Sequence, residues 1–210
     1  MVWRSCHLAL GACCLLPVQA VASESEFQVT LDPLPKSYRV AVSRGRGDTQ
    51  QSGRHDTHVG VLADIVVGLP EQGFTYEVFP IGGIGFGYAF KRDGDFLDQA
   101  LRMKFHYGLA WRPVPWFRFD AQPFLAPQGS FVTLPRAMVQ AESERDWFLG
   151  GIACGAEASV NVRFARWIGL AVRGGVEGDY VSSSNSTGGV TATLRDGGAV
   201  LAVGLILSSD

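Results

Sequence analysis

The sequence lacks the features that identify several large classes of protein. Eighteen Lys and Arg residues stand against 20 acidic residues, and the basic side chains are scattered singly along the chain. The absence of a basic block argues against nucleic acid as a partner, since nucleic-acid binding needs a basic surface. Charged residues make up only 18% of the chain and apolar residues 47%, a composition that is too apolar for a disordered protein. One folded domain is the expectation for this length.

Cysteine is scarce as well. The chain has four cysteines, and three of them (Cys6, Cys13, Cys14) lie near its start. Outside that region only Cys154 remains, which excludes a framework of disulfides. Cys154 falls on the apolar face of an alternating stretch, so we interpret it as a small apolar side chain that faces lipid rather than as a nucleophile.

Residues 1–22 have the three parts of a secretory signal peptide in the required order. Arg4 supplies the positive charge, Leu8 to Val18 supply the apolar run, and Ala20-Val21-Ala22 forms a small-x-small cleavage site. A membrane-spanning helix is the alternative, but Pro17 interrupts a stretch that barely reaches the roughly 20 residues a span needs. A lipoprotein signal ending at Cys13 is a weaker alternative. We therefore expect a signal peptide over 1–22 and one domain over 23–210.

Beyond the signal peptide, apolar and polar residues alternate repeatedly, and no window sustains a helical period. Most of the alternating stretches have about ten or more residues, close to the 9–11 that a tilted strand needs to cross a bilayer. Eight stretches are predicted: 37–45, 57–68, 74–91, 100–111, 116–126, 148–164, 167–181 and 198–208.

The connections between these stretches are of two kinds. Those after the second, fourth and sixth stretches are short, whereas those after the first, fifth and seventh are long and polar. Short turns on one side and long loops on the other are typical of outer-membrane barrels, whose turns face the periplasm. The pattern predicts an all-β fold, an eight-stranded antiparallel up-and-down transmembrane β-barrel.

Alternation alone does not say which face is inside, because a soluble barrel would alternate in the same way. An interior of eight strands is too narrow for roughly forty large apolar side chains, which places the apolar face outside. The polar face carries Gly83, Gly85, Gly87 and Ala89, which leave room for long charged neighbours. Aromatic residues near strand ends predict a girdle at the bilayer interface, consisting of Tyr38, Tyr76, Trp111, Trp116, Phe164, Trp167 and Tyr180.

In these features the chain resembles the small outer-membrane barrels of the OmpA/OmpX type. The resemblance is one of architecture and covers essentially all of residues 23–210. It implies an outer-membrane location and says little about activity. One departure is the C-terminus, Leu207-Ser208-Ser209-Asp210, where that class usually ends on an aromatic residue used in assembly.

If the polar face is inward, it lines the barrel with equal numbers of basic and acidic residues. Buried charges must be paired, so this balance predicts a plug of ion pairs rather than an open pore. The turns predict the pairs Glu157 with Arg173 and His106 with Asp120, and bring Asp64 close to Glu77. The predicted network consists of Arg39, Asp64, Glu77, Arg102, Lys104, His106, Arg118, Asp120, Glu157, Arg163, Arg173, Glu177 and Asp179.

Other motifs favour ordinary structural interpretations. Arg46-Gly47-Asp48 spells an adhesion tripeptide but is ordinary turn chemistry, and Gly82 to Gly87 has neither the spacing nor the helix of a phosphate loop. Two groups of possible metal ligands lack the number or spacing of ligands that a metal site needs: His55 with His58, and Asp93 with Asp95 and Asp98. We therefore predict no catalytic, cofactor or metal site.

Three functions remain open. The first is a non-enzymatic, monomeric anchor that contacts outer-membrane lipid and offers its loops to a surface ligand or host partner. The second is a narrow channel for small or hydrophobic solutes, as in OmpW-like barrels. The third is an enzyme that modifies lipid A, which would need a nucleophile or activated water with a base.

Overall fold

The computed structural model describes residues 24–44, 47–70, 77–185 and 190–209, so the predicted signal peptide lies outside the described residues. Two short 3₁₀ helices, η2 (Arg136–Met138) and η3 (Glu142–Glu144), connect β7 to β8. The strands are β1 (Glu24–Asp32), β2 (Ser37–Arg44), β3 (Gly47–Arg54), β4 (Thr57–Gly68), β5 (Val78–Asp93), β6 (Phe96–Val114), β7 (Phe117–Thr133), β8 (Asp146–Ala165), β9 (Ile168–Asn185) and β10 (Val190–Ser209).

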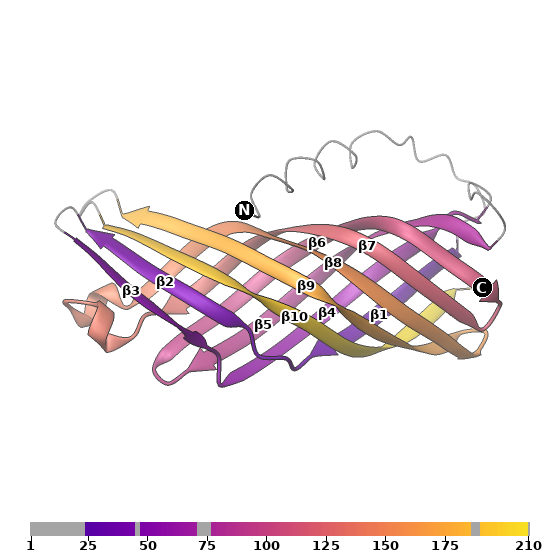
Figure 1. The fold of residues 1–210 in the computed structure, drawn as a ribbon, viewed down its shortest axis with the longest axis horizontal. Helices are drawn as coiled ribbons and strands as arrows, with labels where there is room; N and C mark the ends of the chain where they lie inside the picture. The colour runs from indigo at the N-terminus through magenta and orange to yellow at the C-terminus, as the bar shows by residue number, and fades with distance from the viewer. Residues whose placement is uncertain (1–23, 45–46, 71–76, 186–189, 210) are drawn as a thin grey trace.

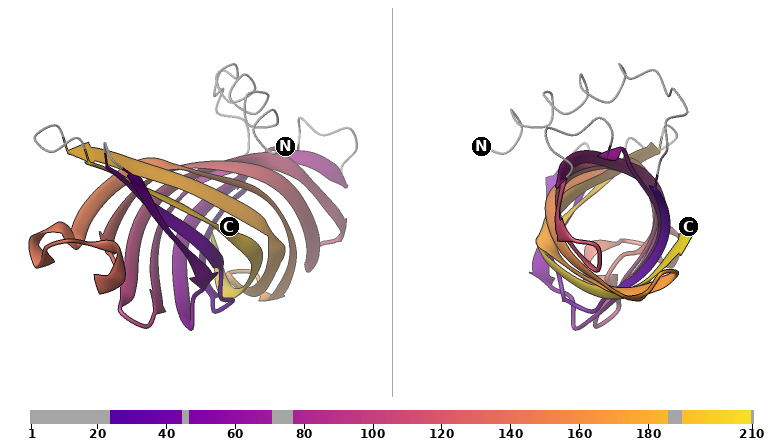
Figure 2. Two further views of the ribbon diagram at one scale, coloured as in Figure 1. Left: turned by 60° about the vertical axis from the view of Figure 1, so that its left-hand side comes forward. Right: turned by 90° about the vertical axis from the view of Figure 1, so that its right-hand side faces the viewer.

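The strands close into one ring of antiparallel neighbours. Their order is β1-β4-β5-β6-β7-β8-β9-β10-β2-β3, and β1 also pairs with β10. Because β1 and β2 both pair with β10, they act as two halves of one strand, and β3 with β4 forms the next strand. The ten segments therefore make eight strands around a closed barrel, which the end view in Figure 2 shows as a ring. This confirms the predicted fold class.

The breaks in the first two strands lie side by side. Residues 33–36 separate β1 from β2 and include two prolines, Pro33 and Pro35, which have no N–H to donate to a ladder. The Asp32 carboxylate accepts the N–H of Leu34 at 3.0 Å, and the His55 N–H donates to the Lys36 carbonyl at 3.0 Å. These hydrogen bonds keep β2 aligned with β1, and β3 aligned with β4, so the wall of the barrel continues past the breaks.

The register fixes the tilt of the strands. A row of paired residues starts at Phe27 on β1, passes through Ile65, Ile84, Phe105, Leu125, Cys154, Gly178 and Gly197, and returns to Ser37 on β2. The return point is ten residues further along the chain (37 minus 27). With the usual strand spacings, a stagger of ten over eight strands gives a tilt of roughly 40°.

Both described chain ends and the tight turns of β6–β7 and β8–β9 lie at one end of the barrel, which we call the terminal end. The opposite end, with the β2–β3, β5–β6, β7–β8 and β9–β10 connections, is the loop end (Figure 1). Much of what the sequence predicts as loop is strand: β3 occupies 47–54, β10 begins at Val190, and β1 precedes the first predicted stretch. Strands of up to 20 residues are longer than a bilayer needs, so the barrel is tall.

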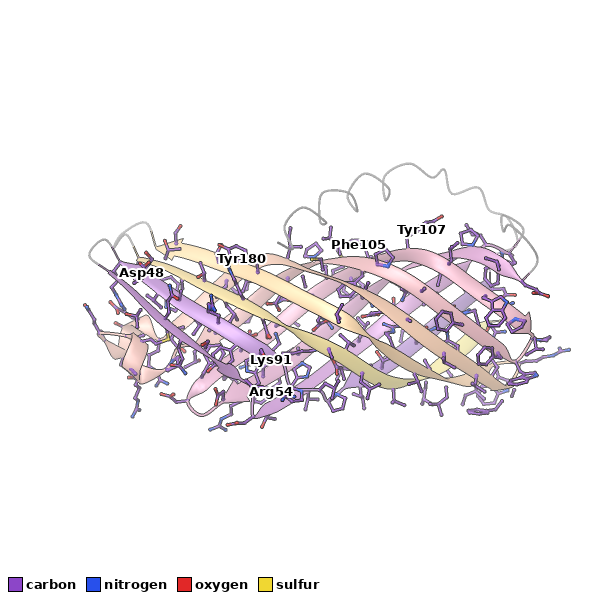
Figure 3. All side chains as sticks on the ribbon, in the orientation of Figure 1. Asp48, Arg54, Lys91, Phe105, Tyr107 and Tyr180 are labelled. Atoms are coloured by element: carbon purple, nitrogen blue, oxygen red, sulfur yellow. The ribbon has the colours of Figure 1, made fainter. Side chains whose placement is uncertain are left out.

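Over most of its height the wall is apolar outside and polar inside, and Figure 3 shows side chains such as Phe105 and Tyr107 on the outer surface. Outward Phe86, Leu101 and Leu205 are 63%, 54% and 55% exposed, whereas inward Asp64 and Lys104 are fully buried. This is the inside-out arrangement of a protein whose solvent is lipid. The described part of the chain contains no helix with the length and apolarity of a transmembrane segment.

At the loop end the arrangement is reversed on β2, β9 and β10. There the inward side chains are apolar, such as Val40, Val181 and Leu194, which are all fully buried. The outward residues Ser43 and Ser184 are polar and exposed. Since a water-soluble barrel has this polarity, the reversal marks where these strands leave the apolar belt.

Candidate functional site in the barrel interior

Many ionisable side chains meet in the interior of the barrel. Of the predicted network, eleven side chains lie inside, and they are carried by β4, β6, β7, β8 and β9. They are Asp64, Arg102, Lys104, His106, Arg118, Asp120, Glu157, Arg163, Arg173, Glu177 and Asp179.

The cluster nearest the terminal end is built around two buried acids, Glu26 and Asp120. Arg118 Nη2 lies 2.7 Å from Glu26, and its Nε lies 2.8 Å from Asp120. Arg163 reaches the other oxygen of Glu26 at 2.5 Å, and Arg112 pairs with Glu24. Each acid of this cluster therefore faces at least one guanidinium, which offsets the cost of removing it from water.

The central cluster connects five strands, β4, β6, β7, β8 and β9. Arg173, 1% exposed, lies 3.3 Å from Asp64 and 3.4 Å from Glu157, and Lys104 Nζ lies 2.5 Å from Glu157. His106 bonds Asp64 through Nε2 at 2.9 Å and Gln122 through Nδ1 at 2.8 Å. The predicted Glu157–Arg173 pair forms, but the two residues are not directly opposed: Glu157 is the register partner of Gly175, one diagonal step from Arg173.

Two more clusters continue towards the loop end. Lys36, which enters the interior at the strand break, lies 2.9 Å from Asp32 and 3.4 Å from Glu177, and Arg102 lies 2.9 Å from Glu177. Beyond them Lys91 is surrounded by three carboxylates, those of Asp98 at 3.2 Å, Asp179 at 3.4 Å and Asp196 at 2.5 Å. His55 Nε2 lies 3.3 Å from the same oxygen of Asp196 that Lys91 contacts.

Glycines on β5 make room for these side chains. A Cβ atom on Gly83 would lie 2.5 Å from His106 Nε2, and one on Gly85 would lie 3.0 Å from Asp64 Oδ1. A Cβ on Gly87 would lie 3.1 Å from Arg102. As the sequence predicts, the small residues of this face give space to long charged neighbours in a narrow interior.

An apolar cluster fills the interior at the loop end. Leu134 and Met138 from the β7–β8 connection are buried against side chains of β2, β6, β9 and β10. Below them the rings of Tyr38, His55 and Phe96 stack, and the Tyr38 hydroxyl donates to Asp93 at 2.7 Å. The complete cluster is Tyr38, Val40, Val42, Phe96, Val132, Leu134, Met138, Leu149, Val181, Ala192 and Leu194.

An ion pair holds the β7–β8 connection over this cluster. Arg44 at the end of β2 lies 2.9 Å from Glu144 in η3. The Gln140 N–H also donates to the Glu144 carboxylate, and these two donors hold the pKa of Glu144 below its usual value. The connection is therefore tied to the wall of the barrel.

Three parts of the predicted site are wrong. Arg39 points outward and is exposed, because β2 lies in the region of reversed polarity. Glu77 is exposed beside the β4–β5 turn and does not reach Asp64, which Arg173 and His106 contact instead. His106 does not meet Asp120, because the β6–β7 register pairs Asp120 with Ala110, four residues away from His106.

The aromatic girdle is partly as predicted. Trp111, Trp116, Phe164 and Trp167 are 47–67% exposed around the terminal end, and Tyr180 is 38% exposed towards the loop end. Tyr38 is not part of it, since its ring is buried in the apolar cluster. Tyr76 lies outside the described residues.

The sequence prediction missed several interior residues. Glu26 and Asp32 belong to β1, which was not predicted as a strand, although their alternation with Phe27, Val29 and Leu31 is a usable signal. His55 and His58, which the sequence offers only as a poor metal set in the first loop, are both buried inside the barrel. Within the described ranges, no group of three or more His, Cys, Asp or Glu side chains could hold a metal ion.

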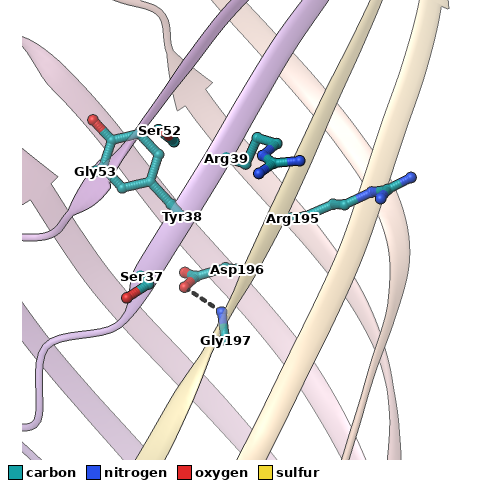
Figure 4. A pocket seen from close by; sticks show the side chains of 8 residues that line it. All are labelled: Ser37, Tyr38, Arg39, Ser52, Gly53, Arg195, Asp196 and Gly197. Atoms are coloured by element: carbon teal, nitrogen blue, oxygen red, sulfur yellow. Dashed lines mark hydrogen bonds between the residues drawn. The ribbon is translucent and has the colours of Figure 1, made fainter. Parts of the chain in front are cut away.

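Two pockets lie away from the centre of the interior. One, of about 10 Å³, is enclosed by residues of the terminal end that include Glu26, Trp116 and Arg163. The other, of about 590 Å³, lies at the wall where β2, β3 and β10 meet (Figure 4). Its lining residues are Ser37, Tyr38, Arg39, Ser52, Gly53, Arg195, Asp196 and Gly197.

A closed eight-stranded ring with a paired ionic interior and an apolar outer belt defines the class of small transmembrane β-barrels. No family model and no curated protein matches the chain. Among solved structures it is similar to Neisserial surface protein A (14% identity, TM-score 0.44, 86% of this chain and 96% of that one). It is also similar to Ail of Yersinia pestis (9%, 0.38, 85% and 99%) and to OprG of Pseudomonas aeruginosa (9%, 0.38, 89% and 94%). These are small outer-membrane β-barrel proteins.

Proposed function

We propose that this protein is a monomeric, non-enzymatic outer-membrane barrel whose sealed interior makes it a rigid anchor for the loop end. The observation that carries the proposal is the continuous series of buried ion pairs, from Arg118 and Glu26 near one end to Lys91 and Asp196 near the other. The apolar cluster around Leu134 and Met138 closes the series at the loop end. By the usual orientation of such barrels, the loop end faces outside and meets a surface ligand.

Charge pairing supports a sealed interior rather than a water-filled one. Lys104, Asp64 and Arg173 are each no more than 2% exposed, so their charges are compensated by one another and not by water. An ion crossing the barrel would have to separate these pairs in a medium of low dielectric constant. We therefore expect the barrel not to conduct.

Conductance in a planar bilayer tests the proposal. The folded protein, verified by its heat-modifiable migration on a gel, should give no reproducible conductance steps under conditions in which a known porin does. Discrete, reproducible steps from the wild-type barrel would instead favour the second candidate, a narrow channel for small or hydrophobic solutes.

The third candidate, a lipid A-modifying enzyme, is not supported by the position of the histidine–carboxylate pairs. His106 with Asp64 and His55 with Asp196 resemble the base and orienting acid of hydrolases, but their side chains are at most 1% exposed and face the interior. A lipid substrate would approach from the outer wall. Lipid A incubated with the purified barrel should keep its mass, and a product of changed mass would contradict a non-enzymatic role.

A further inference from the structure

Two arginines are directly opposed in register on the outer wall, away from the ionic interior. Arg39 on β2 is the register partner of Arg195 on β10, and both side chains are exposed. Neither forms an ion pair with any carboxylate in the part of the chain that the structure describes. Like charges on directly opposed residues repel each other and destabilise a sheet. An anion bound between the two arginines would remove this repulsion.

A third arginine and several hydroxyl groups lie around the pair. Ser52 is the β3 partner of Arg39, and Arg54, which is exposed, lies one diagonal step away, opposite Ser37. Ser37, Ser52 and both arginines line the 590 Å³ pocket, and Figure 4 shows the two arginine side chains on neighbouring strands. Asp196 also lines the pocket, but its carboxylate turns inward to Lys91 and His55.

The position of the two arginines along the barrel axis shows which part of the membrane surrounds them. Arg195 is the register partner of Tyr180, and its guanidinium lies 5.4 Å from the centre of that ring. Towards the terminal end the outer wall is apolar, with Val176 and Leu201 62% and 46% exposed. Towards the loop end it carries Ser182, Ser184 and Thr193. The arginines thus lie at the boundary between an apolar belt and a polar rim, where lipid headgroups are found.

We propose that Arg39 and Arg195 form a binding site for the phosphate of an outer-leaflet lipid headgroup, with Arg54, Ser37 and Ser52 at its edge. The inference rests on the membrane placement in the proposed function. Guanidinium groups pair with phosphate oxygens in a bidentate manner, and hydroxyl groups donate further hydrogen bonds. The apolar wall below accommodates the acyl chains of the same lipid, which a soluble anion does not have.

Native mass spectrometry of the folded barrel in dodecyl maltoside, titrated with bisphosphorylated lipid A, tests the site. The double variant Arg39→Gln, Arg195→Gln should bind this lipid roughly tenfold or more weakly than the wild type, since it loses two charge-assisted contacts. Arg166→Gln, which removes an exposed arginine from the turn at the opposite end, is the matched control and should bind as the wild type does. Dephosphorylated lipid A should bind the wild type as weakly as it binds the double variant.

Three outcomes would overturn the site. They are equal binding by the double variant, equal binding of dephosphorylated lipid A, and displacement of the lipid by millimolar inorganic phosphate, which would identify a free anion as the ligand. Flotation with lipid vesicles distinguishes failure of the phosphate site from failure of the proposed function. A barrel that floats with vesicles but lacks the phosphate preference refutes only the site, whereas one that stays in the aqueous fraction refutes the membrane placement and the site together.

Discussion

At the scale of single residues, Arg173 is the side chain that connects the central ion pairs of the interior. Its guanidinium lies between Asp64 and Glu157 and also donates to the Gln28 side chain at 3.1 Å. It therefore links β9 to β1, β4 and β8 at the level where the interior is most charged. The same two acids have one further partner each: Lys104 contacts Glu157, and His106 contacts Asp64.

Replacing Arg173 with Met should destabilise the barrel by about 3–5 kcal/mol, because it leaves buried carboxylates with too few cations. The measurement is equilibrium urea unfolding in detergent or vesicles. Arg173→Met combined with Glu157→Gln should recover part of the loss, since the excess negative charge is then removed. The matched control Arg166→Met, at an exposed turn, should change stability little. A single Arg173→Met variant as stable as the wild type would show that the pairs do not hold the interior.

At the scale of elements, β5 shows how a strand is fitted to its neighbours. Its inward face is Phe79, Ile81, then Gly83, Gly85 and Gly87, and the charged side chains of β4 and β6 occupy the space over the glycines. A Cβ on Gly83 would lie 2.1 Å from the Ile65 carbonyl oxygen and 2.5 Å from His106. Either the β4–β5 pairing or the His106 ring must move to admit it.

Gly83→Ala should therefore destabilise the barrel by about 1–3 kcal/mol, the usual cost of overpacking. Gly150→Ala is the matched control, because a Cβ at Gly150 of β8 would meet nothing within 4 Å. Urea unfolding of the two variants beside the wild type measures the difference. The packing account is contradicted if the two substitutions have equal effects.

Most strands could be predicted from the sequence, but β3 and the interior partners could not. Alternation located β4 to β9 because Leu101 to Trp111 and similar runs keep one apolar face. It failed at β3, whose sequence Gly47 to Arg54 is polar on both faces and owes its strand conformation to pairing with β2. It also failed to place His106, because the partner of an interior side chain depends on strands that are distant in the sequence, such as β1, β4 and β9.

At the scale of the whole molecule, the barrel consists of two regions of opposite polarity. In the larger one, apolar side chains face outward around paired charges, and at the loop end β2, β9 and β10 enclose an apolar cluster behind a polar surface. A single rule for the whole chain, apolar outside and polar inside, therefore placed Asp64 and Arg118 correctly and misplaced Tyr38 and Arg39. The position of the boundary depends on the height of each residue in the barrel, which follows from the stagger of ten residues and not from local sequence.

Spin labels at two outward positions of β10, Leu201 and Thr193, test this polarity most directly. The labels are attached to cysteines in an otherwise cysteine-free barrel in lipid vesicles, and their collisions with oxygen and with a water-soluble nickel complex are compared by electron paramagnetic resonance. We expect the label at Leu201 to collide with oxygen and to be shielded from nickel, and the label at Thr193 to show the reverse. Equal exposure of both labels to the nickel complex would contradict an apolar belt in contact with lipid.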